Sequence, residues 1–114
     1  MLQTLTTPRG ETLSGTPWQV YPRPQMRRDS YINLNGEWDF AVSSGKPETF
    51  DMRITVPFCP ESRLSGIGRH FEEGAPLWYR RRFLLPEGFR RERVLLHIGA
   101  ADQIAEVFVN GQYL

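Results

Sequence analysis

Acidic side chains are the first candidates for chemistry in this sequence. Two carboxylates about 5–5.5 Å apart can cleave a glycosidic bond, one as acid and base and the other as nucleophile. The acidic residues that could serve are Glu61, Glu72, Glu73, Asp102 and Glu106. Glu72 and Glu73 are adjacent in a predicted loop and are best explained as a solvated surface pair. Glu61 follows Pro60 at a turn, where we expect it to accept hydrogen bonds from backbone amides. We therefore assign no catalytic residue.

Aromatic side chains could bind a sugar, because sugar rings stack on indole and phenol faces. The candidates are Trp18, Trp38, Trp78 and Tyr79. Trp38 and Tyr79 share their sides of predicted strands with aliphatic residues, so we expect them to pack in the core. Trp78 points the other way, beside Arg80 and Arg82. It is either covered by a neighbouring domain or open to a ligand.

Two further polar residues lie side by side in a long predicted loop, Arg69 and His70. Exposure to solvent without any ligand is one interpretation for His70. His97 alternates with Leu96 and Ile98 and should face the opposite side from them. Two histidines and one cysteine at these spacings predict no metal site, and we expect no cofactor. Cys59 has no base nearby in the sequence and is interpreted as a small packed side chain.

One arginine is expected in the interior. Arg81 shares a side of its strand with Tyr79 and Phe83, and a buried arginine needs a partner. We expect a carboxylate in that role, Asp102 or Glu61. For Asp102 itself, which follows Gly99-Ala100-Ala101 at a corner between strands, we expect a cap on nearby amides. A sugar contact is the alternative there.

Strands must position all these residues. Apolar residues alternate with polar ones over residues 34–42, which predicts a half-buried antiparallel strand. Further strands are expected over residues 52–57, 77–85, 93–99 and 104–109, with loops over residues 43–50 and 57–76. No segment has the period of a helix. Long loops in compact domains are usually functional, so residues 57–76 are of interest.

The N-terminal segment is rich in proline, and the C-terminal segment contains a signal for a hairpin turn. Residues 1–29 contain four prolines, each of which lacks a backbone donor, so we expect an extended lead-in without helix or strand. Asn110-Gly111 is the strongest short signal for a hairpin turn. A hairpin needs a returning strand, and only Gln112, Tyr113 and Leu114 follow. We expect a β-sandwich that is incomplete at its C-terminus and a natural fold that continues.

Composition narrows the class of protein. With 114 residues there is room for one domain, and a net charge of +1 gives no reason to expect a nucleic-acid or membrane partner. The opening residues lack a basic segment followed by an apolar stretch, so no signal peptide is expected. A single cysteine cannot build a disulfide framework, which favours a cytoplasmic protein. Frequent aromatics, glycines and prolines favour an all-β fold.

Three groups of motifs, taken together, resemble one known family. Residues 34–40 (LNGEWDF) are similar to the opening strand of the sugar-binding domain of family 2 glycoside hydrolases. Residues 54–67 (ITVPFCPESRLSGI) resemble a segment found in one branch of those enzymes. The core of that domain is matched by residues 77–83 (LWYRRRF), 96–103 (LHIGAADQ) and 107–111 (VFVNG). The motifs cover roughly residues 30–114, in the family's order.

The resemblance implies a jelly-roll-like antiparallel β-sandwich of the galactose-binding type, with residues 30–114 as its first part. In the intact enzyme an immunoglobulin-like domain and a (β/α)₈ barrel would follow, and the barrel would supply both catalytic glutamates. β-Galactosidases, β-glucuronidases and β-mannosidases, which hydrolyse terminal β-glycosides, belong to this family. This chain would then be a non-catalytic, sugar-binding accessory domain that also contributes to contacts in a homo-oligomer.

The resemblance also suggests where a carbohydrate would touch the chain. The expected contacts at the pocket rim are Glu61, Arg69, His70 and Trp78. Two alternatives stay open, a stand-alone carbohydrate-binding module and a structural interaction domain without a ligand.

Overall fold

The computed structural model describes residues 7–15, 19–20, 23–26 and 28–114. The predicted contact of Trp18 with a sugar lies outside this range. The elements are α1 (Pro8–Thr12), η1 (Pro24–Met26), β1 (Gly36–Val42), β2 (Met52–Val56), η2 (Arg63–Ser65), β3 (Leu77–Arg80), β4 (Phe108–Val109) and β5 (Gln112–Tyr113). Two compact units can be distinguished, residues 1–84 and 85–114, and each is described by itself.

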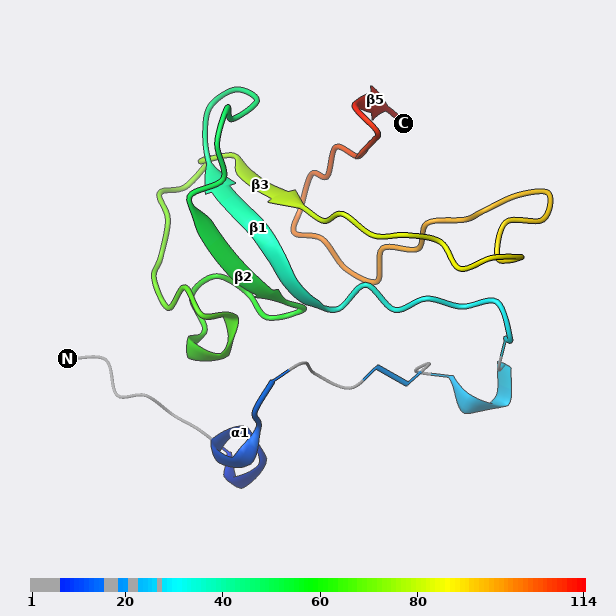
Figure 1. Ribbon diagram of the computed structural model, residues 1–114. Helices are drawn as coiled ribbons and strands as arrows, with labels where there is room; N and C mark the ends of the chain where they lie inside the picture. Colours follow the sequence, from blue (N-terminus) through cyan, green and yellow to red (C-terminus); the bar gives the residue numbers. More distant parts are fainter. Residues whose placement is uncertain (1–6, 16–18, 21–22, 27) are drawn as a thin grey trace. The chain divides into compact units, whose positions relative to one another are not determined.

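The first unit is built on a three-stranded antiparallel sheet in the order β2-β1-β3 (Figure 1). Trp38 lies opposite Ile54, and Phe40 lies opposite both Met52 and Tyr79. Because residues directly opposite each other share a face, this register places the apolar residues on one side of the sheet. We call this the apolar face; it comprises Trp38, Phe40, Val42, Met52, Ile54, Leu77 and Tyr79.

The other side of the sheet carries the residues in between. Asp39 lies opposite Arg53 on β2 and opposite Arg80 on β3. Glu37 and Thr55 form another pair, and Ala41 pairs with Trp78. We call this side the polar face. The prediction of a half-buried antiparallel strand from the alternation in residues 34–42 is therefore confirmed, because β1 has one apolar and one polar side.

The core is small and lies around β1. Among the described residues, the buried hydrophobic side chains are Phe40, Ala41 and Ile54. The ring of Phe40 has an edge contact with Tyr79, with 5.1 Å between ring centroids, and a tilted contact with Phe71 at 5.7 Å. Tyr79 is nevertheless 40% exposed and Trp38 is half-buried, so the expected burial of these two residues is only partial.

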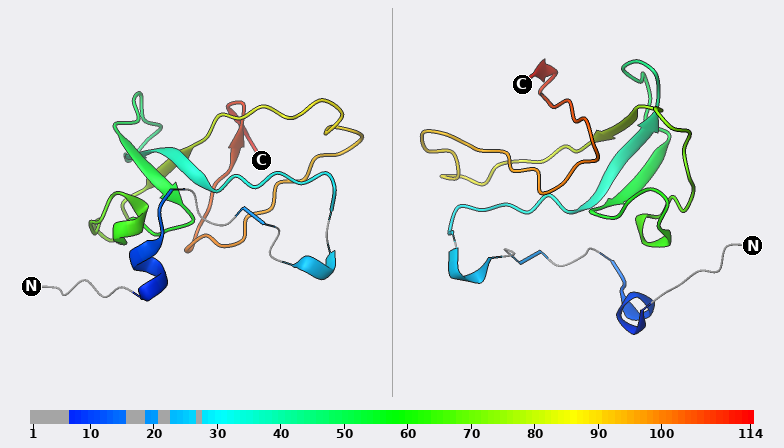
Figure 2. Two further views of the ribbon diagram at one scale, coloured as in Figure 1. Left: turned by 60° about the horizontal axis from the view of Figure 1, so that its bottom comes forward. Right: turned by 180° about the vertical axis from the view of Figure 1, so that it is seen from behind.

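The loop over residues 57–76 runs from the end of β2 back to the start of β3 beside the sheet (Figures 1 and 2). Its turn η2 is organised by Ser65, which is 1% exposed. The Ser65 hydroxyl donates toward the carbonyls of Ser62 at 2.7 Å and Pro60 at 3.1 Å, and its oxygen accepts from the amide of Ile67 at 3.0 Å. These contacts give the loop a defined shape in spite of its length.

The described part of the lead-in contains the short helix α1 and the 3-10 turn η1, neither of which the sequence analysis expected. The Thr7 hydroxyl oxygen caps α1 by accepting a hydrogen bond from the amide of Gly10, and Pro8 stands at the first helical position. Proline is favoured there because that position has no hydrogen-bonded amide to lose. The prolines therefore exclude a long helix but allow this single turn. None of the helices among the described residues is long and apolar enough to cross a membrane.

The second unit, residues 85–114, has less regular structure than expected. Its strands are β4 and β5, joined at Asn110-Gly111, where both residues have positive φ (51° and 80°). The predicted hairpin is therefore confirmed. The strand expected over residues 93–99 is absent, and the one expected over 104–109 is reduced to its last two residues. A strand is stable only when its backbone groups are paired, and alternation in the sequence cannot supply the partner.

Candidate functional site

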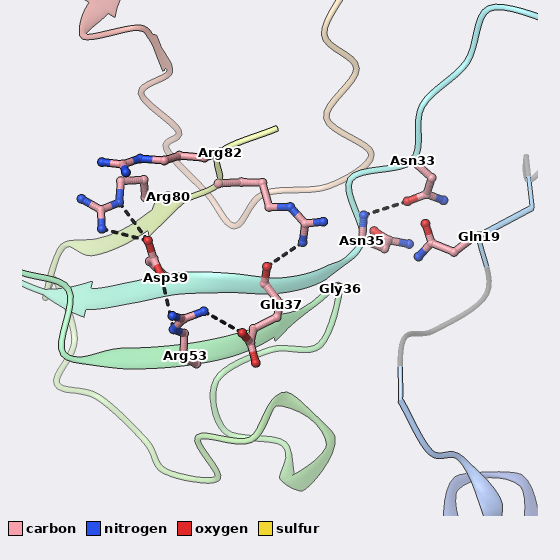
Figure 3. A pocket seen from close by; sticks show the side chains of 10 residues that line it. Gln19, Asn33, Asn35, Gly36, Glu37, Asp39, Arg53, Arg80 and Arg82 are labelled. Carbon is pink, nitrogen blue, oxygen red and sulfur yellow. Dashed lines mark hydrogen bonds and ion pairs between the residues drawn. The ribbon is translucent and has the colours of Figure 1, made fainter. Parts of the chain in front are cut away.

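The polar face of the sheet carries a row of charged side chains from three strands (Figure 3). Arg80 donates two hydrogen bonds to Asp39 Oδ2, from Nε at 2.9 Å and from Nη2 at 2.8 Å. Arg53 approaches Asp39 Oδ1 at 3.4 Å from the other side and pairs with Glu37 Oε1 at 2.6 Å. Asp39 is thus held between two guanidinium groups, and its side chain is 24% exposed.

An aromatic ring fixes one end of this row. The guanidinium carbon of Arg80 lies 4.1 Å from the ring centroid of Phe50, a distance typical of a cation–π contact. The stack and the two hydrogen bonds to Asp39 restrict the planar guanidinium from two directions. Arg80 therefore belongs to the framework of the polar face.

Beside this row lies a cleft of about 590 Å³. Its lining consists of Gln19, Asn33, Asn35, Gly36, Glu37, Asp39, Arg53, Arg80, Arg81 and Arg82. Figure 3 shows Arg80 and Arg82 on one side of the cleft, with Asn33, Asn35 and Gln19 on the other. Four arginines face two carboxylates, so the lining has an excess of positive charge. Guanidinium groups only donate hydrogen bonds, whereas side-chain amides both donate and accept.

The prediction that a carboxylate pairs with Arg81 is wrong. Arg81 Nη1 donates to the backbone carbonyl of Glu37 at 2.6 Å, and no described carboxylate forms an ion pair with it. Asp102, one of the two expected partners, belongs to the second unit. Arg81 is half-buried and not fully enclosed, so the protein can satisfy it with a neutral acceptor and water.

The loop residues predicted at a pocket rim lie away from this cleft. Glu61 Oε1 is 3.6 Å from His70 Nδ1, and both side chains are largely exposed. Arg69 lies over the ring of Phe71 at 4.9 Å and donates toward the sulfur of Met52 at 3.3 Å. Glu61, Arg69 and His70 therefore stand on one loop, but the cleft lining does not include them. The predicted role of Glu61 as an acceptor for backbone amides is replaced by its approach to His70.

Trp78 is separated from those three residues. It lies on the polar face, as expected from its alternation with Tyr79, and its indole N–H donates to the carbonyl of Ser43 at 3.0 Å. The indole is therefore tied to the turn after β1. The structure brings together three of the four predicted contacts and leaves Trp78 on the other face of the sheet.

Near the loop, two acidic groups affect the ionisation of the Tyr79 phenol. Burial raises the pKa of Tyr79 above its ordinary value of 10.0, and the negative charges of Glu61 and of the Cys59 thiolate raise it further. Cys59 itself is exposed, so its expected packing in the interior is wrong. Among the residues that the structure describes, no group of three His, Cys, Asp or Glu side chains could hold a metal ion.

The sequence analysis missed the cleft, although a signal for it was present. Glu37 and Asp39 are the polar partners in the alternation of β1. Arg80 ends β3, and Arg82 follows two residues later. Opposite charges at alternating positions of neighbouring strands predict cross-strand pairs. Which strands are neighbours was the missing information. No protein-family model and no curated protein matches this chain.

Proposed function

We propose that this chain is a non-catalytic, sugar-binding accessory domain of a family 2 glycoside hydrolase. The observation that supports sugar binding is the cleft on the polar face, with its volume of about 590 Å³. This value falls within the range of about 300–1,000 Å³ that is usual for small-molecule sites. Sugar hydroxyls both donate and accept hydrogen bonds, which suits a lining of amides, carboxylates and guanidinium groups.

The non-catalytic part of the proposal rests on the state of the two carboxylates in the cleft. A glycosidase needs one carboxyl group that keeps its proton, usually in an apolar setting. Glu37 and Asp39 are instead paired with Arg53 and Arg80, and the Glu37 side chain is 65% exposed. In this proposal a barrel domain supplies the catalytic pair for hydrolysis of a terminal β-glycoside.

The fold that accompanies this function is a jelly-roll-like β-sandwich. The apolar face needs a second layer, because Leu77 and Tyr79 are 37% and 40% exposed. In the same proposal Glu61, Arg69 and His70 border the sugar pocket of a neighbouring barrel.

The test is calorimetric titration of the 114-residue chain with galactose, mannose and glucuronate. We expect at least one of these sugars to bind with a Kd of about 1 mM or tighter, which corresponds to about −4.1 kcal/mol. Arg53→Gln, within the cleft, should weaken that binding, whereas Lys46→Gln in the turn after β1 should not. Failure of every sugar to bind would refute the sugar-binding role. Turnover of a chromogenic β-galactoside by the pure chain would refute the non-catalytic one.

A structural interaction domain is the second candidate. It is favoured by the exposed aliphatic residues of the second unit, among them Leu95, Leu96, Ile98 and Ile104, which are 50–89% exposed. Contiguous exposed apolar surface often marks a site of association. If no sugar binds and the chain associates with a separately produced barrel domain, this second function is correct.

A further inference from the structure

The cleft on the polar face contains more positive charge than its carboxylates neutralise. Asp39 takes both hydrogen bonds from Arg80 and is approached by Arg53, which also pairs with Glu37. These two carboxylates therefore account for the charges of Arg53 and Arg80. Two arginines remain in the lining, Arg81 and Arg82.

Among the residues that the structure describes, neither of these two arginines has an anionic partner. Arg81 is anchored through one nitrogen to the neutral carbonyl of Glu37, which positions the side chain without neutralising it. Arg82 is exposed, and within the described part of the chain no ion pair or hydrogen bond engages its guanidinium group. A guanidinium group offers five donors in a fixed plane that matches carboxylate and phosphate oxygens.

The other wall of the cleft has a different chemistry. Asn33 and Asn35 stand there, and the Asn33 side chain accepts a hydrogen bond from the amide of Asn35 at 2.8 Å. This bond fixes the Asn33 oxygen, while the amide group of Asn35 lines the cleft. Amide side chains complement hydroxyl groups and have no preference for an anion. A ligand that satisfies both walls therefore needs an anionic group on one side and hydroxyls on the other.

We propose that this cleft selects anionic sugars, that is, saccharides with a carboxylate or phosphate group, over neutral ones. This inference rests on the proposed sugar-binding function and names the ligand class of the same site. Arg81 and Arg82 contact the anionic group or groups of the ligand, and Asn35 contacts its hydroxyls. Arg53 and Arg80 keep the polar face in place through Asp39.

The experiment compares D-glucuronate and D-glucose 6-phosphate with D-glucose, each titrated into the 114-residue chain at low ionic strength. We expect both anionic sugars to bind at least about tenfold more tightly than glucose, because hydrogen bonds to charged groups are the stronger ones. Added salt should reduce this preference, since it screens charges near the surface. The tighter of the two anionic ligands identifies the preferred group.

Variants test which residues carry the selectivity. Arg81→Gln and Arg82→Gln should each reduce the affinity for the anionic sugars by about tenfold and reduce the affinity for glucose by much less. Lys46→Gln removes one positive charge from the same unit outside the cleft. It should change neither the affinity for the anionic sugars nor that for glucose. Arg82 is exposed, so its variant tests the proposal even if Arg81→Gln does not fold.

Three results would overturn the inference. Equal affinity for glucose and both anionic sugars would remove the selectivity and leave the proposed sugar-binding function intact. Acetate or inorganic phosphate binding as tightly as the sugars would show an anion site without sugar recognition. Absence of binding by every sugar would show that the proposed function itself is wrong.

Discussion

Tyr79 is the residue whose ionisation the fold alters most directly. Its phenol stands against Phe40, and Glu61 and Cys59 place negative charge near it. Both effects oppose the formation of a tyrosinate, so the folded chain holds the phenol proton to higher pH than the unfolded chain does. The loop and β3 are thus coupled electrostatically, although the rim residues on the loop do not line the cleft.

The stability of the chain should therefore fall at high pH. Because the pKa of Tyr79 is raised in the folded state, its contribution is fully present below 10.0 and is lost as the pH rises through and above that value. Urea unfolding at a series of alkaline pH values should show a steeper decline in the parent than in Tyr79→Phe. Glu61→Gln should lower the pKa of Tyr79, measured from tyrosinate absorbance, and Glu72→Gln should have less effect. Identical titration of the parent and Glu61→Gln would contradict the coupling.

A second prediction at this scale concerns Ser65. Its buried hydroxyl serves two carbonyls and one amide of the loop, and its removal leaves those groups with fewer partners. We expect Ser65→Ala to lower the free energy of unfolding by about 1–3 kcal/mol, measured by urea denaturation. Ser44→Ala, at an exposed position, is the matched control and should be close to neutral. A neutral Ser65→Ala would mean that water replaces the hydroxyl.

At the scale of elements, β1 organises the first unit because it pairs on both sides. Its apolar residues hold the core, and its polar residues hold the cleft. The strand begins at Gly36, which is buried and has a φ of 119°. Residues that carry a Cβ rarely adopt this backbone conformation. The entry into β1 therefore depends on this glycine.

Substitution of Gly36 should be costly. We expect Gly36→Ala to destabilise the chain by about 1–3 kcal/mol, because the residue must keep a strained backbone conformation or shift the register. Gly45→Ala is the control, since a Cβ there meets nothing within 4 Å and no positive φ is involved. The two midpoints of urea unfolding give the comparison. Equal midpoints would show that β1 can begin without the positive φ.

The whole molecule consists of two units that differ in their degree of order. The first has a paired sheet, a small core and a charged cleft, whereas the second has only a two-residue hairpin ladder stabilised by the contact of Phe108 with Tyr113. In the second unit none of the residues is buried. Its aliphatic residues have the pattern of strands without the partners that strands need.

Hydrogen exchange should report this difference. We expect the amides of β1 to exchange slowest, since this strand is hydrogen-bonded on both sides, and those of residues 93–99 to exchange near the rate of an unstructured chain. Exchange followed by NMR or mass spectrometry on the 114-residue chain measures both. Slow exchange over residues 93–99 would indicate that these residues form a sheet after all.

Local patterns in the sequence predicted much of the first unit. The alternation in residues 34–42 and 52–57 anticipated β1 and β2, and Asn110-Gly111 anticipated the terminal turn. The strand expected over residues 77–85 is present as β3, but it ends at Arg80. These predictions succeeded because periodicity and turn chemistry depend on residues close together in the chain. Strands in an antiparallel arrangement, and thus the all-β character of the regular structure, follow from the same signals.

Pairing between distant segments was decided only by the tertiary structure. The sequence showed which side of β1 is polar, but only the order β2-β1-β3 places Arg53 and Arg80 on either side of Asp39. For the same reason Arg81 met a backbone carbonyl and not the expected carboxylate, and residues 93–99 formed no strand. A side chain's type and spacing fix what it can bind, whereas its partner depends on which remote segment the fold brings within reach.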